Sequence, residues 1–136
     1  MKQYYYFILI GLITFCFSCQ PTTSADAGKN ATTTSAEAKD GITSKAEFIK
    51  LLEGETSPQL IDVRTPQEFS QGAIEGAINY DYYNDDFTGQ MAGLDKSRPV
   101  YIYCQSGGRS GKACKMLKKM GVEKIYDLEG GYKVWK

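Results

Sequence analysis

Short apolar segments alternate with helical segments along residues 42–136. Among the apolar segments, Val100-Tyr101-Ile102-Tyr103 has the clearest strand pattern, because β-branched and aromatic residues fill it. The strands predicted in this way lie at 60–63, 77–80, 100–103 and 125–128. Strands that alternate with helices are typical of an α/β fold, so we expect a small parallel β-sheet flanked by helices.

Capping residues mark the helices between these strands. Ser44 and Glu47 have the spacing of a capping box ahead of an apolar stripe. Thr65 followed by Pro66 is typical of the first positions of a helix. The helical segments predicted in this way run from Ser44 to Gly54, over 65–69, 87–94 and 110–120, and from Gly130 in a terminal turn.

The N-terminal part of the chain follows a different pattern. An apolar run from Tyr4 to Phe17 is too short to span a bilayer and fits the core of a signal peptide. It ends in Ser18-Cys19, which resembles the cleavage site of a bacterial lipoprotein. That resemblance implies removal of residues 1–18, lipidation of Cys19, and a periplasm-facing lipoprotein anchored in the bacterial cell envelope. An ordinary signal peptide and an uncleaved anchor are the alternatives.

Residues 19–41 are predicted to be a lipidated, disordered linker ahead of a domain over 42–136. From Gln20 to Gly41 the chain is rich in Ser, Thr and Ala and has no large apolar residue, so it cannot offset the entropy of ordering. Cleavage and lipidation would leave two thiols, Cys104 and Cys114, rather than a two-disulfide framework.

The composition excludes several classes of site. The chain has no histidine, which excludes a Ser-His-Asp triad, a Cys-His dyad and metal sites built on imidazole. Sixteen Lys and Arg residues balance sixteen Asp and Glu residues, so charge gives no argument for nucleic-acid binding. We expect neither a metal nor a cofactor. A catalyst in this chain must rely on cysteine, carboxylates, basic side chains, hydroxyls and backbone amides.

A glycine-containing loop follows the strand at 100–103. Cys104 ends this strand, and loops at the carboxyl ends of parallel strands are where α/β sheets bind ligands. Glycines at a helix N-terminus let successive N–H groups point inward, which lowers the pKa of a nearby thiol and binds an anion. We therefore predict Cys104 as the nucleophile, against the alternative of an inert buried cysteine. The predicted substrate-binding residues are Gln105, Ser106, Gly107, Gly108, Arg109 and Ser110, with Arg109 as the anion contact. The alternatives are an ordinary turn for the two glycines and, for Arg109, a surface pair with a carboxylate.

Three stretches resemble the rhodanese-like domain family: 61–79, which holds Ile61-Asp62-Val63-Arg64, the loop at 101–110, and 128–135. Ala73 stands where that family usually has histidine. The resemblance implies a rhodanese-like fold and a sulfurtransferase. The resemblance also implies that the cysteine takes sulfane sulfur from thiosulfate or a similar donor as a persulfide. The persulfide then passes this sulfur to cyanide, a thiol or a protein. Asp62 and Arg64 match supporting positions, as a buried ion pair that shapes the loops or as direct substrate contacts.

Two other functions stay open. A cysteine phosphatase or arsenate reductase would use a similar cradle, but only four residues separate Cys104 from Arg109, one fewer than phosphatase loops have. A non-catalytic, partner-binding domain is the second, and the presence of Cys104 argues against it. Cys114 fits the buried face of its predicted helix, where a resolving role would need movement. The sequence leaves open whether Tyr80, Tyr82 and Tyr83 line the site.

Overall fold

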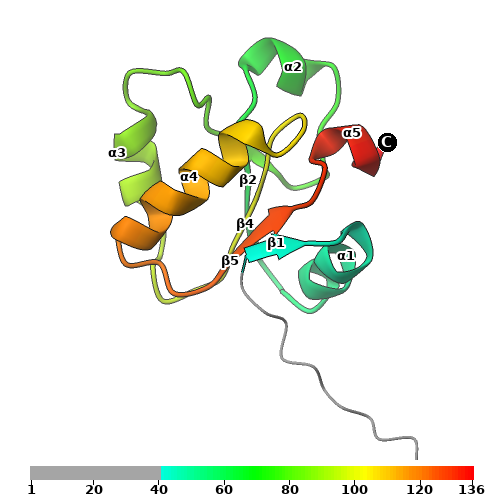
Figure 1. Ribbon diagram of the computed structural model, residues 1–136, viewed down its shortest axis with the longest axis horizontal. Helices are drawn as coiled ribbons and strands as arrows, with labels where there is room; N and C mark the ends of the chain where they lie inside the picture. The colour runs from blue at the N-terminus through cyan, green and yellow to red at the C-terminus, as the bar shows by residue number, and fades with distance from the viewer. Residues whose placement is uncertain (1–40) are drawn as a thin grey trace, which may run out of the picture. The chain divides into compact units, whose positions relative to one another are not determined.

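A computed structural model describes residues 41–136, which form one parallel sheet with the strand order β1-β5-β4-β2-β3 (Figure 1). Helices connect and cover the strands, which confirms the predicted α/β fold. The strands are β1 (Gly41–Thr43), β2 (Gln59–Asp62), β3 (Ile78–Asn79), β4 (Val100–Tyr103) and β5 (Ile125–Leu128). The helices are α1 (Lys45–Glu53), α2 (Pro66–Ser70), α3 (Phe87–Ala92), α4 (Gly108–Lys119) and α5 (Tyr132–Trp135).

Strand β1 is not among the strands that the sequence predicts. It begins at Gly41, the last residue of the predicted linker, and pairs in parallel with β5. The N–H of Glu129 donates to the carbonyl of Thr43 at 2.9 Å and extends this pairing. The strand therefore depends on its neighbour β5 rather than on an apolar pattern of its own.

Several N-terminal predictions lie outside the described residues. These are the signal peptide over 1–18, the lipidated Cys19, and the linker as far as residue 40. Within residues 41–136, no helix combines the length and the apolar character needed to cross a membrane.

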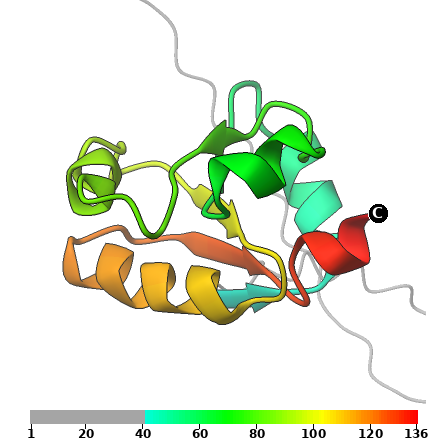
Figure 2. The ribbon, with the colours of Figure 1, turned by 90° about the horizontal axis from the view of Figure 1, so that it is seen from above.

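Helices cover both faces of the sheet (Figure 2). Helices α3 and α4 pack on one face, where Met91 and Leu117 join a core with Ile102 of β4. Helices α1 and α5 pack on the other face, where Phe48 contacts Tyr101 edge to face at 5.7 Å between ring centroids. All four residues of β4 are buried, as expected of a parallel strand that is covered on both sides.

The N-termini of α2 and α4 are formed in different ways. At α2, the Thr65 hydroxyl accepts the N–H of Glu68 at 3.2 Å, and the Glu68 carboxylate accepts the N–H of Thr65 at 3.0 Å, so the predicted N-cap is a full capping box. Helix α4 begins at Gly108, two residues before its predicted start. Its N-cap, Gly107, has a φ of 96°, a conformation that favours glycine.

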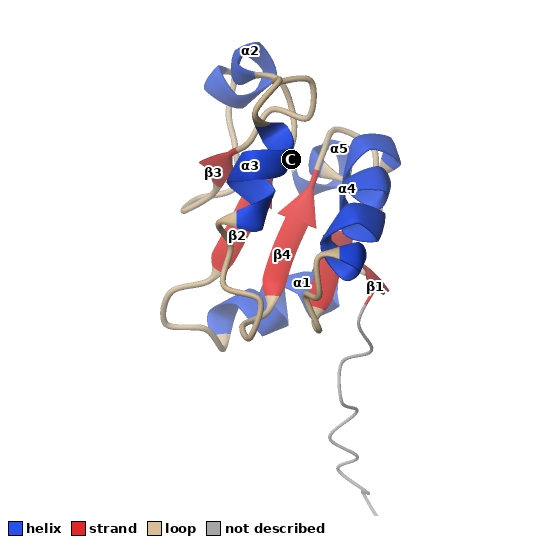
Figure 3. Cartoon of the chain, turned by 90° about the vertical axis from the view of Figure 1, so that its left-hand side faces the viewer, coloured by secondary structure: helices blue, strands red, loops and turns tan. Residues whose placement is uncertain are grey.

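The parallel strands bring several loops to one edge of the sheet. Strand β4 runs towards the end of the domain where α2 and α5 lie (Figure 3). Cys104 follows β4 at this edge, Arg64 lies just beyond β2, and Gly130-Gly131 follows β5. The predicted catalytic loop, residues 104–110, therefore lies between segments that are far apart in the sequence.

Candidate active site

The loop after β4 folds back over the sulfur of Cys104. The Sγ atom accepts hydrogen bonds from the N–H of Gly107 at 3.1 Å and from the hydroxyl of Ser110 at 3.5 Å. Cys104 is 1% exposed and Ser110 is fully buried. The structure thus brings the predicted nucleophile together with two of the predicted loop residues at the N-terminus of α4.

The environment of Cys104 favours its thiolate form. Burial alone raises the pKa of a thiol. Here hydrogen bonds from the Ser110 hydroxyl and from the N–H groups of Ser110, Ser106 and Gly107 outweigh burial, so the pKa of Cys104 is lowered. A thiolate can therefore form without a histidine base, as the sequence predicts from the cradle.

Arg109 is bound by a carboxylate from another helix. Its Nη1 and Nη2 atoms donate to Glu68 of α2 at 2.7 and 2.8 Å. Hydrogen bonding from Arg109 lowers the pKa of Glu68 to about 2, despite partial burial, and the same pair raises the pKa of Arg109. The arginine predicted to contact an anion thus already has an anionic partner, as in the alternative of a pair with a carboxylate. In the sequence, Glu68 is only part of a stretch that resembles the family and is not a predicted site residue.

Asp62 and Arg64 form a buried ion pair behind the loop. The Nη2 atom of Arg64 lies 2.6 Å from Oδ2 of Asp62, and both side chains are almost fully buried. The same Nη2 donates to the carbonyl of Gly72 at 2.7 Å, and the guanidinium lies 4.0 Å from the ring centroid of Tyr132. This geometry supports the loop-shaping interpretation of the pair rather than direct contact with a substrate.

The C-terminal turn is hydrogen-bonded to the predicted catalytic loop. The N–H of Tyr132 donates to the carbonyl of Cys104 at 2.7 Å, and that of Lys133 donates to the carbonyl of Gln105 at 3.1 Å. Gly131, with a φ of 62°, lies so close that a Cβ there would overlap the Cys104 carbonyl and sit 2.8 Å from Ser106 N. In the sequence, Gly131 is part of a predicted turn and of the stretch at 128–135 that resembles the family, and the structure adds that only glycine fits this contact.

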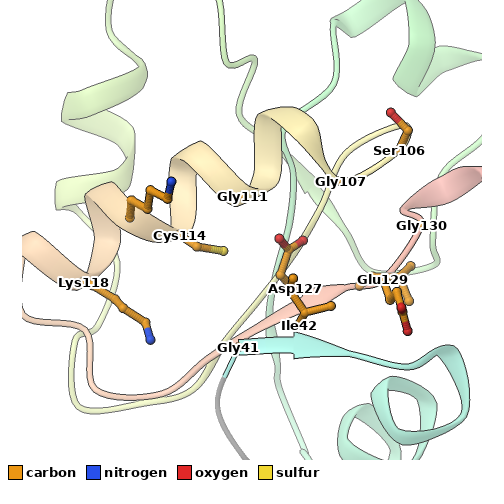
Figure 4. A pocket seen from close by; sticks show the side chains of 12 residues that line it. Gly41, Ile42, Ser106, Gly107, Gly111, Cys114, Lys118, Asp127, Glu129 and Gly130 are labelled. Carbon is orange, nitrogen blue, oxygen red and sulfur yellow. The ribbon is translucent and has the colours of Figure 1, made fainter.

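A cavity of about 540 Å³ lies behind the loop, between α4, β5 and β1 (Figure 4). Ser106 and Gly107 of the loop line it, together with Cys114 of α4 and Asp127 of β5. Burial, together with the nearby Asp127, raises the pKa of Cys114 to about 12, which keeps this thiol protonated at neutral pH. Cys104 and Cys114 are both free thiols in the structure, and the high pKa of Cys114 disfavours a resolving role.

The three tyrosines whose role the sequence leaves open differ in position. Tyr80 and Tyr82 pack against the core on the α3 side, and the ring of Tyr82 contacts Phe87 at 5.2 Å. Tyr83 is 68% exposed and its ring lies 5.8 Å from the guanidinium carbon of Arg109. Of the three, Tyr83 is therefore the one that lies beside the predicted catalytic loop.

A smaller cavity of about 250 Å³ lies near Gln105, and Arg64, Glu68 and Tyr132 also line it.

Within residues 41–136, no three acidic or cysteine side chains are grouped so that they could hold a metal ion.

The comparisons with known proteins agree with this geometry. The family model of the rhodanese-like domain matches residues 44–136. The chain is 43% identical over 82 residues to uncharacterized protein YqhL of Bacillus subtilis, covering 60% of this chain and 64% of that protein, a little under two thirds of its length. It is 41% identical over 85 residues to the protein named thiosulfate sulfurtransferase 16, chloroplastic, of Arabidopsis thaliana. That match covers 55% of this chain and 71% of that protein. The solved structure of a rhodanese-like domain protein from Staphylococcus aureus matches with a TM-score of 0.62 and 27% identity, over 70% of this chain and 90% of that one.

Proposed function

This chain belongs to the rhodanese-like domain family, and we propose that it is a sulfurtransferase in which Cys104 carries the transferred sulfur as a persulfide. The observation that carries the proposal is the position of Cys104 Sγ, which accepts hydrogen bonds from Gly107 N–H and the Ser110 hydroxyl. The relative named a thiosulfate sulfurtransferase supports the same class of reaction.

The proposed reaction has two displacements at sulfur. In the first, the Cys104 thiolate attacks the outer sulfur of thiosulfate, the bond to the inner sulfur breaks, and its electron pair leaves with sulfite. In the second, cyanide or a thiolate attacks the outer sulfur of the persulfide, and the electron pair of the broken bond returns to Cys104. The cradle of N–H groups stabilises the anionic sulfur at the start and at the end of the cycle.

Phosphoryl chemistry fits this site less well. The loop between Cys104 and Arg109 is one residue shorter than phosphatase loops, which narrows the cradle. Both terminal nitrogens of Arg109 also bind Glu68, whereas a phosphatase needs its arginine for the phosphate oxygens. We therefore expect negligible activity on aryl phosphates.

A turnover assay with thiosulfate as donor and cyanide as acceptor tests this proposal. Cys104→Ser should keep the fold, because the change is small, and should lose turnover to background. Cys114→Ser is the matched control and should keep most of the activity, because that protonated thiol has no part in the proposed reaction. Equal losses in both variants would instead favour a dithiol redox mechanism.

We also propose that the protein is exported and anchored by lipid on Cys19, on the basis of the apolar run and the Ser18-Cys19 pair that follows it. A fatty-acid probe should label the wild type in bacterial cells, and Cys19→Ala should abolish the label. Wild-type protein that stays in the cytoplasm and takes up no label would contradict this placement.

A further inference from the structure

Asp127 is a buried carboxylate that the proposed reaction does not use. It lies in β5 between Ile42 of β1 and Ile102 of β4, which are its partners in the register of the sheet. The residue is 5% exposed, and its Oδ1 atom has no hydrogen-bond partner among the described residues. Of these partners, Ile102 is fully buried and Ile42 is 77% exposed. Burying a carboxylate oxygen without a hydrogen-bond partner is costly, so its presence calls for a physical explanation.

The carboxylate lies next to the serine that binds the nucleophile. Figure 4 shows Asp127 pointing from β5 towards the first turn of α4, and its Oδ2 atom is 3.8 Å from where a Cβ on Gly111 would stand. Ser110 belongs to the same turn, and its hydroxyl donates to Cys104 Sγ. A hydroxyl has one proton to donate, so an ionised Asp127 competes with Cys104 for the proton of Ser110.

We propose that Asp127 is a positioning residue that acts through the Ser110 hydroxyl and thereby controls how readily Cys104 ionises. The inference rests on the proposed role of Cys104 as the nucleophile. When Asp127 is protonated, it can donate to Ser110 Oγ. The Ser110 hydroxyl then keeps its own hydrogen bond to Sγ, which stabilises the thiolate. When Asp127 is ionised, it attracts that proton and places a negative charge near the thiolate, and both effects oppose ionisation of Cys104.

Both forms of Asp127 are accessible near neutral pH. Burial raises its pKa to about 6, against the opposing effect of hydrogen bonding with Ser110 and Cys114. The other charged groups that face the same cavity are Lys115 and Lys118 of α4, which favour the ionised form, and Glu129, which follows β5 and opposes it. The flanking strands contribute only Ile42 and Ile102 at the level of Asp127, so they add no charge.

The pH dependence of Cys104 alkylation in the full chain tests this inference. The rate of modification by iodoacetamide is followed from about pH 4.5 to about pH 10 by mass spectrometry of the peptide that bears Cys104, so the other cysteines do not interfere. The wild type should show an additional inflection near pH 6. Asp127→Asn should lose that inflection, because its amide donates permanently to Ser110 and carries no charge.

Asp127→Asn should also make Cys104 react roughly threefold faster at neutral pH, which corresponds to a downward pKa shift of about half a unit for a thiol that is mostly protonated. When Ser110→Ala is also present, the gain from Asp127→Asn should be reduced by at least about half. The hydroxyl that transmits the effect is then gone, and only the through-space effect of the Asp127 charge is left. Glu129→Gln removes a charge from the same cavity without touching Ser110. It should keep the inflection, moved slightly to lower pH because Glu129 opposes ionisation of Asp127.

A wild-type pH profile that shows only one titration step and no inflection near pH 6 would overturn the inference. This result does not depend on whether a variant folds. So would superimposable profiles for the wild type and Asp127→Asn, or an equal gain with and without the Ser110 hydroxyl. Alkylation requires only the thiol and no sulfur donor. A protein that fails to transfer sulfur can therefore still pass this test, and an active sulfurtransferase can fail it.

Discussion

Glu68 holds Arg109 beside the catalytic loop through two hydrogen bonds, Oε2 to Nη1 at 2.7 Å and Oε1 to Nη2 at 2.8 Å. The pair joins α2 to the first turn of α4 and neutralises much of the positive charge next to Cys104. An anionic sulfur donor must therefore use the remaining N–H groups of Arg109 or displace Glu68. This arrangement makes the two residues a natural target for tests of donor binding.

Arg109→Ala should weaken the use of thiosulfate. The variant loses a charge-assisted contact worth about 2–3 kcal/mol, so kcat/KM should fall roughly 30–150-fold. It also leaves the Glu68 carboxylate unpaired near an anionic donor. Adding Glu68→Gln should restore part of the activity, because the repulsive charge is removed. The loss should be smaller for an uncharged sulfane donor, and equal losses for the two donors would count against a contact with the sulfonate.

Acid should weaken the domain through Glu68. Hydrogen bonding from Arg109 lowers the pKa of Glu68 from its usual value near 4.5 to about 2. The stabilisation is therefore complete above about pH 4.5 and is lost as pH falls towards 2. Urea denaturation over this range should show a steeper loss of stability for the wild type than for Glu68→Gln. Glu75→Gln, at an exposed carboxylate, should keep the wild-type slope; a shared slope in all three proteins would contradict the assignment.

Arg64→Ala should destabilise the fold strongly. It leaves Asp62 buried without its cation, and breaking a buried pair in this way costs about 3–5 kcal/mol. Arg98→Ala is the matched control, because Arg98 is exposed and its side chain donates to the Ser57 carbonyl rather than to a buried carboxylate. Its cost in urea denaturation should stay within about 1 kcal/mol. Similar costs for the two variants would show that the Asp62–Arg64 pair does not support the fold.

Gly131→Ala should damage the catalytic loop. Its Cβ would overlap the Cys104 carbonyl, so the loop must shift, and such a misplacement can lower kcat/KM roughly a hundredfold. Gly121 also has a positive φ, of 89°, but open space surrounds its Cβ position. Gly121→Ala should therefore cost some stability and leave kcat/KM unchanged. Equal activity in the two variants would mean that the C-terminal turn does not position the loop.

Local patterns in the sequence predict the elements whose causes are local. The Thr65 cap with Pro66 gives α2, and the β-branched and aromatic residues of 100–103 give β4. The hydrogen bonds to Cys104 also follow from a local motif, because Gly107 and Ser110 lie within six residues of it.

Long-range contacts account for what the sequence does not predict. Strand β1 forms because β5 offers it a partner, and its own three residues lack a strand pattern. Arg109 pairs with Glu68 from 41 residues away, and Gly131 meets Cys104 only after the sheet has formed. Asp127 looks like an ordinary polar residue in a strand until the packing of α4 places it beside Ser110.

The intact mass of the protein after incubation with thiosulfate shows whether Cys104 takes up the transferred sulfur. We expect a gain of one sulfur atom, located on the peptide that bears Cys104 and removed again by cyanide. Cys104→Ser should show no gain, and Cys114→Ser should gain as much as the wild type. The absence of a persulfide with every sulfane donor, together with strong activity on aryl phosphates, would contradict the account.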